Sequence, residues 1–262
     1  MFPRKGRLKM KGRSLRISPY RRAVADLMHF SQQVPAVTAE RRMDLSPLMA
    51  ARAAIPDRPS WTVLFSKAFA MLGRDHPCLR RAYLKCPWAR FYEHPHNIAA
   101  LNVERRLPDE DIVLFCLIRS PENRTLAEMD AMVRHHRDTP VEQLRCYKRS
   151  SGMGNIPWPF RRLVWWSALN MFGRRRCHNF GTFSVSSIAS AGAGLLTLVP
   201  ILTSAIHYGM FEGSVLPMRL TFDHRVMDGA AVARILVDFE QMLNRELVKE
   251  LTGGPPAMRI AA

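Results

Sequence analysis

The feature that most limits the possible folds of this chain is residues 177–211, which contain no Asp, Glu, Lys or Arg. A membrane span needs about 20 apolar residues, so the length of the run alone would allow one. Its apolar half, however, is interrupted by Pro200 and His207, and serines and glycines are frequent before it. Residues 181–186 alternate between polar and apolar side chains, as a half-buried strand does. We therefore expect residues 177–211 to form sheet interior and not a transmembrane helix.

The next segment, 220–229, predicts a strand that ends at the head of a helix. An apolar run leads into His224, and residues 230–247 carry apolar side chains on one helical face. An imidazole held at the rim of a sheet can exchange protons with a substrate near neutral pH. A histidine with an aspartate four residues later is more often a simple turn. Here Asp228 and Gly229 complete the denser pattern D-H-R-x-x-D-G between strand and helix, which favours a functional site.

Helical and strand patterns alternate along the rest of the chain, which predicts an α/β fold with one mixed sheet. We expect helices at both ends of 20–54 and over 60–72, 125–135 and 163–172. Gly73 should end the helix over 60–72. We expect strands at 35–44, 90–93, 98–103, 111–118 and 181–186, with further buried strands and a turn over 195–208. A chain of 262 residues fits one large domain or two small ones, and we expect a single domain over 18–252.

The charge of the chain is strongly positive, with Lys+Arg 39 against Asp+Glu 22 and a net charge of +17. An excess of this size favours anionic partners, namely nucleic acid, anionic membrane surface or phosphorylated small molecules. Much of it lies in residues 1–17, which we interpret as a basic tail; residues 253–262 form a second tail. Nucleic acid is the least favoured of the three partners.

The five cysteines are scattered without C-x-x-C or Cys/His spacing. This pattern predicts reduced thiols in a reducing compartment, which suggests the cytoplasm. We expect neither a disulfide framework nor a metal site.

Residues 157–176 form an aromatic helix between arginine clusters, with Trp165 and Trp166 at its centre. The segment is too short to span a bilayer but would suit an interfacial helix on anionic lipid. The alternative, which we favour, is a helix buried against its own domain or a partner subunit.

Several motifs together resemble a known family. Residues 222–229, F-D-H-R-V-M-D-G, look like the signature of the catalytic domain of 2-oxo acid dehydrogenase acyltransferases (the dihydrolipoamide acyltransferase family). Residues 181–187, G-T-F-S-V-S-S, resemble the upstream strand of the same family, G-T-F-T-I/V-S-N/S. Residues 21–25 are similar to its opening helix. The resemblance runs from about residue 19 to residue 249.

This resemblance implies a two-layer sandwich like that of chloramphenicol acetyltransferase, assembled into homotrimers with active sites between subunits. Coenzyme A or acyl-CoA would be the substrate. His224 would act as general base, and Ser186 of the neighbouring subunit would donate a hydrogen bond to the oxyanion. Asp228 would hold the loop through an ion pair with Arg21, and Gly229 would let the chain turn into the last helix.

The chain also departs from the family pattern. A short basic tail stands where lipoyl and subunit-binding modules would be, so we expect no lipoyl group on this chain. Residues 157–176 are an insertion just before the Ser186 strand. The acceptor therefore stays open between a separate lipoylated protein and an unrelated alcohol, amine or lipid. The rival hypothesis is a non-catalytic or lipid-directed membrane-associated protein on the same trimeric scaffold.

Overall fold

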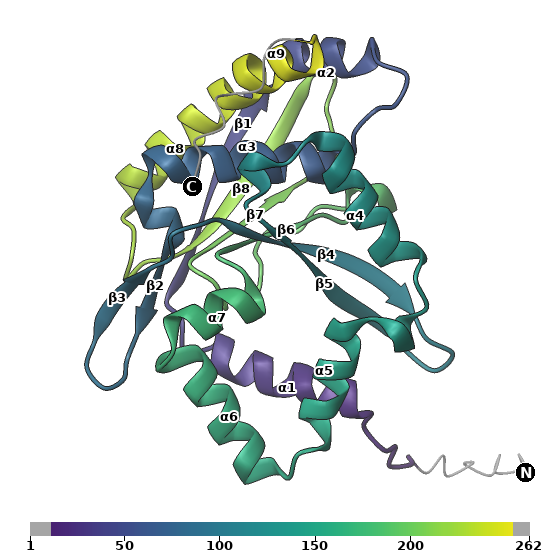
Figure 1. Cartoon of the computed structure of the whole chain (residues 1–262), viewed down its shortest axis with the longest axis vertical. Helices are drawn as coiled ribbons and strands as arrows, with labels where there is room; N and C mark the ends of the chain where they lie inside the picture. Colours follow the sequence, from purple (N-terminus) through teal and green to yellow (C-terminus); the bar gives the residue numbers. More distant parts are fainter. Residues whose placement is uncertain (1–11, 254–262) are drawn as a thin grey trace, which may run out of the picture.

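The computed structural model describes residues 12–253 and contains one six-stranded mixed sheet with helices on both faces (Figure 1). The strands of the sheet are β1 (Ala36–Asp44), β8 (Val215–Asp223), β7 (Ser204–Tyr208), β6 (Phe183–Ser186), β4 (Ile98–Arg106) and β5 (Asp111–Arg119), in this spatial order. A separate ribbon pairs β2 (Arg81–Leu84) with β3 (Arg90–Glu93). The helices are α1 (Pro19–Ser31), α2 (Ser46–Ala53), α3 (Trp61–Asp75), α4 (Leu126–Asp138), α5 (Arg145–Asn155), α6 (Trp158–Asn170), α7 (Gly173–Phe180), α8 (Gly229–Met242) and α9 (Val248–Leu251).

Strand β6 runs parallel to both of its neighbours, β4 and β7, whereas the other three pairings are antiparallel. The predicted α/β class, with one mixed sheet flanked by helices, is confirmed. Residues 1–11 of the predicted basic tail and 254–262 of the predicted C-terminal tail lie outside the described residues.

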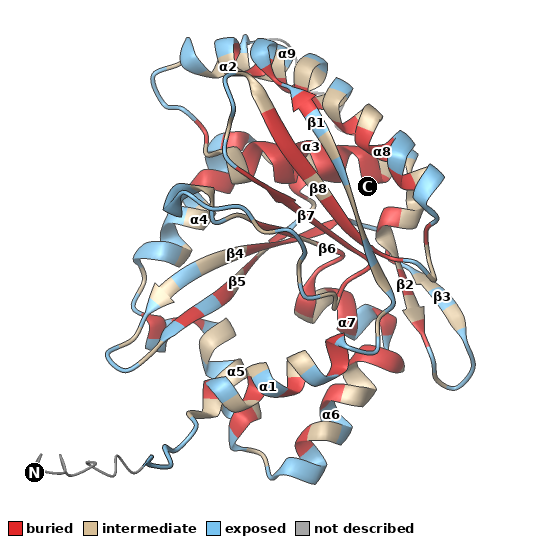
Figure 2. Ribbon diagram, turned by 180° about the vertical axis from the view of Figure 1, so that it is seen from behind, coloured by how far each residue is buried: buried red, intermediate tan, exposed pale blue. Residues whose placement is uncertain are grey.

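One face of the sheet is packed against α3 and α8 (Figure 2). The hydroxyl of Ser60 caps α3 by accepting a hydrogen bond from the Val63 N–H. From Val63 to Gly73 every residue of α3 is buried, so the helix is enclosed on all sides rather than amphipathic. The predicted stop at Gly73 is wrong, because the helix continues to Asp75. The glycine is needed for packing, since a Cβ there would lie 2.5 Å from the Asn97 side chain.

The opposite face of the sheet is covered by α1, α5, α6 and α7 (Figure 1). The carboxylate of Asp26 in α1 is almost fully buried and accepts hydrogen bonds from the guanidinium groups of Arg161 and Arg162 in α6. The predicted helix over 163–172 ends at Asn170, and the arginines at 174–176 that follow it belong to a further helix, α7. Helix α5 was not predicted, because its two glycines and low mean hydropathy give a weak helical pattern.

Within the uncharged run only β6 and β7 are strands. The predicted strands over 195–203 are wrong, because this part is a loop that follows Gly194 and contains Pro200. Among residues 12–253 no helix is both long enough and apolar enough to cross a membrane.

Candidate active site

The predicted junction is confirmed as a turn, residues 224–228, between the end of β8 and the start of α8. Asp223, the last residue of β8, is completely buried, and its carboxylate accepts two hydrogen bonds from the Arg225 guanidinium, at 2.9 and 2.7 Å. It also accepts one from the Arg225 N–H at 3.0 Å. The His224 N–H donates to the Pro35 carbonyl at 3.0 Å. Because bidentate charged pairs have restricted geometry, the backbone on both sides of His224 is fixed.

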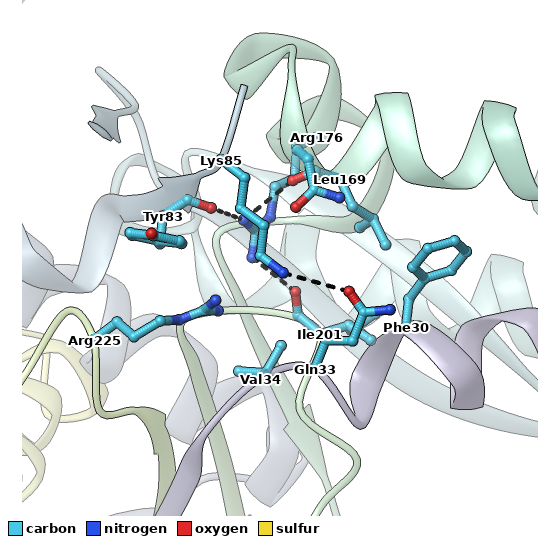
Figure 3. A pocket seen from close by; sticks show the side chains of 10 residues that line it. Phe30, Gln33, Val34, Tyr83, Lys85, Leu169, Arg176, Ile201 and Arg225 are labelled. Carbon is cyan, nitrogen blue, oxygen red and sulfur yellow. Dashed lines mark hydrogen bonds between the residues drawn. The ribbon is translucent and has the colours of Figure 1, made fainter. Parts of the chain in front are cut away.

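Arg225 also lies over the ring of Tyr83 in β2, with the guanidinium carbon 4.3 Å from the ring centroid. Beside it is a small recess of about 30 Å³ (Figure 3). A recess of this size has room for about one water molecule and not for a nucleotide. It is lined by Phe30, Gln33, Val34, Tyr83, Lys85, Leu169, Asn170, Arg176, Ile201 and Arg225.

Arg176 in this recess joins residues 157–176 to the rest of the site. Its buried guanidinium donates hydrogen bonds to the carbonyl oxygens of Tyr83 at 2.8 Å and Ile201 at 2.9 Å. Burial lowers the pKa of Arg176 below its ordinary value. The side chain thus holds β2 and the loop before β7 together, directly behind the turn that carries His224.

The His224 side chain projects outward from this turn and is 47% exposed. Its Nδ1 lies 3.6 Å from Oδ1 of Asp228, which is too long for a hydrogen bond but close enough for electrostatic attraction. Among residues 12–253 the imidazole makes no hydrogen bond to another side chain or to the backbone. An imidazole fixed at its base and open at its tip is suited to proton transfer with an incoming molecule.

Ser186 lies at the C-terminal end of β6 and is 7% exposed. Strand alternation places it on the same face of the sheet as Ser184, opposite the core-facing Phe183 and Val185. The structure therefore places both predicted chemical groups on rigid elements.

The structure does not bring Ser186 and His224 together within one chain. Ser186 pairs with His207 of β7, which pairs with Arg219 of β8. The end of β8 at Asp223 is four residues beyond Arg219, or roughly 13 Å at the rise of a strand, and two strand spacings add about 10 Å across the sheet. A site that uses both residues must therefore combine two copies of the chain.

The predicted ion pair between Arg21 and Asp228 is not formed within the chain. Arg21 is at the start of α1, where its Nε lies 3.4 Å from Glu110 and its guanidinium donates to the Asp111 carbonyl. The expectation that Gly229 is needed for the turn is also not met: its φ is not positive, and a Cβ there would meet no atom within 4 Å.

The aromatic helix α6 packs against the domain through Trp165, which is buried and stacks on Phe180 at a centroid distance of 5.5 Å. The favoured prediction, that the aromatic helix is buried against its own domain, therefore holds at Trp165. The outer face of α6 is nevertheless apolar, with Phe160 and Leu163 more than 60% exposed.

Comparison with known proteins finds a match to the same family over part of the chain. Residues 199–249 match the sequence model of the family 2-oxoacid dehydrogenases acyltransferase (catalytic domain). This match contains His224 and Asp228 but not Ser186. No curated protein sequence matches the chain.

Solved structures match the fold along most of the chain. The cubic core of the pyruvate dehydrogenase multienzyme complex superposes with a TM-score of 0.67 at 17% identity, covering 96% of this chain and 98% of that one. Azotobacter vinelandii dihydrolipoamide acetyltransferase gives 0.65 at 18% identity, with the same coverage of both chains. A probable dihydrolipoamide acetyltransferase from Listeria monocytogenes 4b F2365 gives 0.64 at 16%, covering 89% and 95%. The chain has the fold of a dihydrolipoamide acetyltransferase core. The resemblance predicted from the motifs is confirmed.

In this acetyltransferase fold the sequence had identified the exposed His224 but not the groups that hold it. Arg225 was visible in the D-H-R motif as a neighbour of the histidine. Tyr83 and Arg176 had no distinguishing signal, because nothing in a run of three arginines indicates which one is buried. Among residues 12–253 no group of three His, Cys, Asp or Glu side chains is placed to hold a metal ion.

Proposed function

We propose that the protein is a CoA-dependent acyltransferase whose active site forms between two subunits of a homotrimer. The observation that carries the proposal is the placement of His224 and Ser186. Each lies on a rigid element of an acyltransferase fold, and the two are too far apart to act within one chain. The family match at residues 199–249 supports the reaction class.

In the proposed reaction, Nε2 of His224 accepts the proton of the acceptor thiol or hydroxyl as that group attacks the thioester carbonyl. The carbonyl oxygen becomes an oxyanion, to which the Ser186 hydroxyl of the neighbouring subunit donates a hydrogen bond. Collapse of the tetrahedral intermediate breaks the C–S bond, and the CoA thiolate takes the proton back from the imidazolium. No acyl-enzyme forms.

The Asp228 carboxylate, 3.6 Å from Nδ1, would stabilise the imidazolium that forms during attack. Because Asp228 is 87% exposed, solvent and salt screen this attraction. The Azotobacter vinelandii structure addresses the role of a serine, a histidine and an asparagine in the catalytic mechanism of that enzyme. We infer that Ser186, His224 and Asp228 have the corresponding roles in this chain, with an aspartate in place of the asparagine.

The test is turnover of acyl-CoA by the purified protein. A panel of acyl-CoAs is incubated with thiol acceptors, including free dihydrolipoamide and a lipoylated protein, and with alcohols, while free CoA thiol is followed. We expect at least one pair to turn over, His224→Ala to lose about 10²–10⁴-fold and Ser186→Ala about 10²–10³-fold. Asp228→Asn should keep most of the activity. Turnover that does not depend on His224 would refute the proposed base.

A second candidate function is attachment to anionic membrane through the insertion. The observation that favours it is the exposed apolar side of α6, next to the exposed Arg174 and Arg175 of α7. Residues 143–211 contain no Asp or Glu, so no carboxylate of this segment would repel anionic lipid. Membrane attachment would be compatible with catalysis and would present the enzyme to a lipid-linked acceptor.

A further inference from the structure

A cavity of about 840 Å³ lies between helices α1 and α5–α7 and the sheet face formed by β4, β5 and β6. Its volume is within the range of 300–1,000 Å³ that is typical of small-molecule sites. Within one chain, neither His224 nor Asp228 lines it.

The walls of the cavity are mostly apolar. They combine outward-facing residues of the sheet with helix residues of α1, α6 and α7 and the loop before β7. The main apolar contributors are Val24, Leu27, Met28, Val113, Phe115, Leu117, Trp165, Phe180, Val199, Ile201 and Leu202. A surface of this composition suits a hydrocarbon chain.

The polar residues of the cavity are basic or neutral. Arg119, Arg145 and Arg149 line it, together with His135 and His136, and no Asp or Glu does. In the described part of the chain none of the three arginines has a carboxylate within ion-pair distance, although Arg149 donates a hydrogen bond to the Asn179 side chain at 2.8 Å. A guanidinium group without a carboxylate is a strong binding partner for an anionic ligand group.

Two buried polar atoms of the lining also lack a partner within the described residues: Oδ1 of Asn102 and Nε1 of Trp165. A buried polar atom without a hydrogen bond is unfavourable, and such atoms are rare in folded proteins. One is an acceptor and the other a donor, so a ligand or its bound water would satisfy both.

The cavity also contains a thiol beside an imidazole, Cys146 Sγ at 3.6 Å from His136 Nε2. Burial raises the pKa of Cys146 and lowers the pKa of His136, which favours the neutral form of each. The pair is therefore unsuited to nucleophilic attack and indicates non-covalent binding.

We propose that this cavity binds a long-chain carboxylate of the fatty-acid class. The hydrocarbon chain lies against the sheet and α1, and the carboxylate is held by Arg145 and Arg149. Ser184 lines the cavity and shares a strand face with Ser186, so the bound chain lies on the side of the sheet where the proposed oxyanion donor is found. Ligand binding in this cavity does not require the proposed acyl transfer.

The test is titration of the full-length protein with the fluorescent fatty acid 11-(dansylamino)undecanoic acid, followed by competition with dodecanoate, dodecylamine and dodecanoyl-CoA. We expect saturable binding, displacement by dodecanoate, and at least about tenfold weaker displacement by dodecylamine. Arg145→Ala/Arg149→Ala should raise Kd at least about tenfold, whereas Arg174→Ala/Arg175→Ala on the exposed side of α7 should leave it unchanged.

Filling the cavity provides an independent check. Leu117→Trp should abolish binding. Val199→Trp, in the exposed loop before β7, should also abolish it and serves as the test if Leu117→Trp does not fold. Because the titration requires no acyl transfer, binding without turnover, or turnover without binding, separates a failure of this inference from a failure of the proposed transfer reaction. Lack of saturable binding, unchanged affinity in the filled variants, or displacement by dodecanoyl-CoA but not by dodecanoate would overturn the fatty-acid assignment.

Discussion

The two faces of the sheet are built differently. The face toward α3 and α8 is packed by large buried side chains such as Phe69, which contacts Phe183 and Phe239 at ring distances of 4.9 and 5.5 Å. The face toward α1 and α5–α7 leaves a cavity of about 840 Å³ and exposes aromatic residues on α6. This difference indicates that the packed face stabilises the fold, whereas the open face, which includes residues 157–176, leaves room for a ligand.

The largest expected difference between the faces is in core stability. Phe69→Ala should lower the free energy of unfolding by about 3–5 kcal/mol, because it leaves a void among close-packed rings. Leu117→Ala should lower it by about 2 kcal/mol or less, because one side of Leu117 already faces the cavity. Denaturant unfolding of both variants measures the difference. An equal or larger loss for Leu117 would show that the cavity is closed in solution.

The packing of helix α6 against α1 should depend on one buried carboxylate. Asp26→Ala leaves the guanidinium groups of Arg161 and Arg162 without their partner, and should destabilise the protein by about 3–5 kcal/mol. Faster hydrogen exchange in α6 than in α3 would locate the effect. The exposed control Asp57→Ala should change stability by less than about 0.5 kcal/mol. Equal acceleration of exchange in both helices would contradict a separately anchored α6.

The open face should also make stability depend on pH. His207 is fully buried beneath the loop before β7, and burial lowers its pKa to about 4 from an ordinary 6.5. Between these pH values the unfolded chain binds a proton that the folded chain does not. Stability is therefore complete above pH 6.5 and falls by about 3 kcal/mol on acidification to pH 4.

His207→Gln should make the stability profile between pH 6.5 and pH 4 less steep. His94, whose pKa burial also lowers to about 4, would keep its own share of the pH dependence. Unfolding midpoints measured across this range are the readout, and a slope unchanged by the substitution would contradict the buried neutral state of His207.

The smallest effect concerns the exposed side of α6. Flotation with liposomes that contain anionic phospholipid should recover the wild-type protein, and Phe160→Ser/Leu163→Ser should reduce partitioning roughly tenfold. Val37→Ser, an exposed apolar residue of β1, is the matched control and should float as the wild type does. Absence of the wild type from the floated fraction would exclude this use of the surface.

The sequence predicted the elements that have strong patterns. The alternating β6 strand, the turn at His224 and the final helix were all expected from periodicity and are found. Thr125 was expected to start a helix, and it caps α4 in a full capping box with Glu128.

The parts that sequence reasoning missed depend on tertiary contacts. A glycine often marks the end of a helix. At Gly73, however, Asn97 packs against the backbone and the helix continues. A run of arginines such as 174–176 is typical of a helix end. Arg176 is nevertheless buried and donates hydrogen bonds to carbonyl groups of distant segments. The relation between Ser186 and His224 could be expected only from the family resemblance, because periodicity does not show which ends of two strands lie near each other.

The central claim is that two chains build one active site. Its most direct test mixes two inactive variants, His224→Ala and Ser186→Ala, by co-refolding or co-expression, and measures acyl transfer on the pair that the wild type turns over. In randomly mixed trimers up to about one quarter of the inter-subunit sites combine an intact His224 with an intact Ser186. We predict recovery toward that fraction of wild-type activity. A mixture no more active than the sum of the two separate variants would contradict the inter-subunit site.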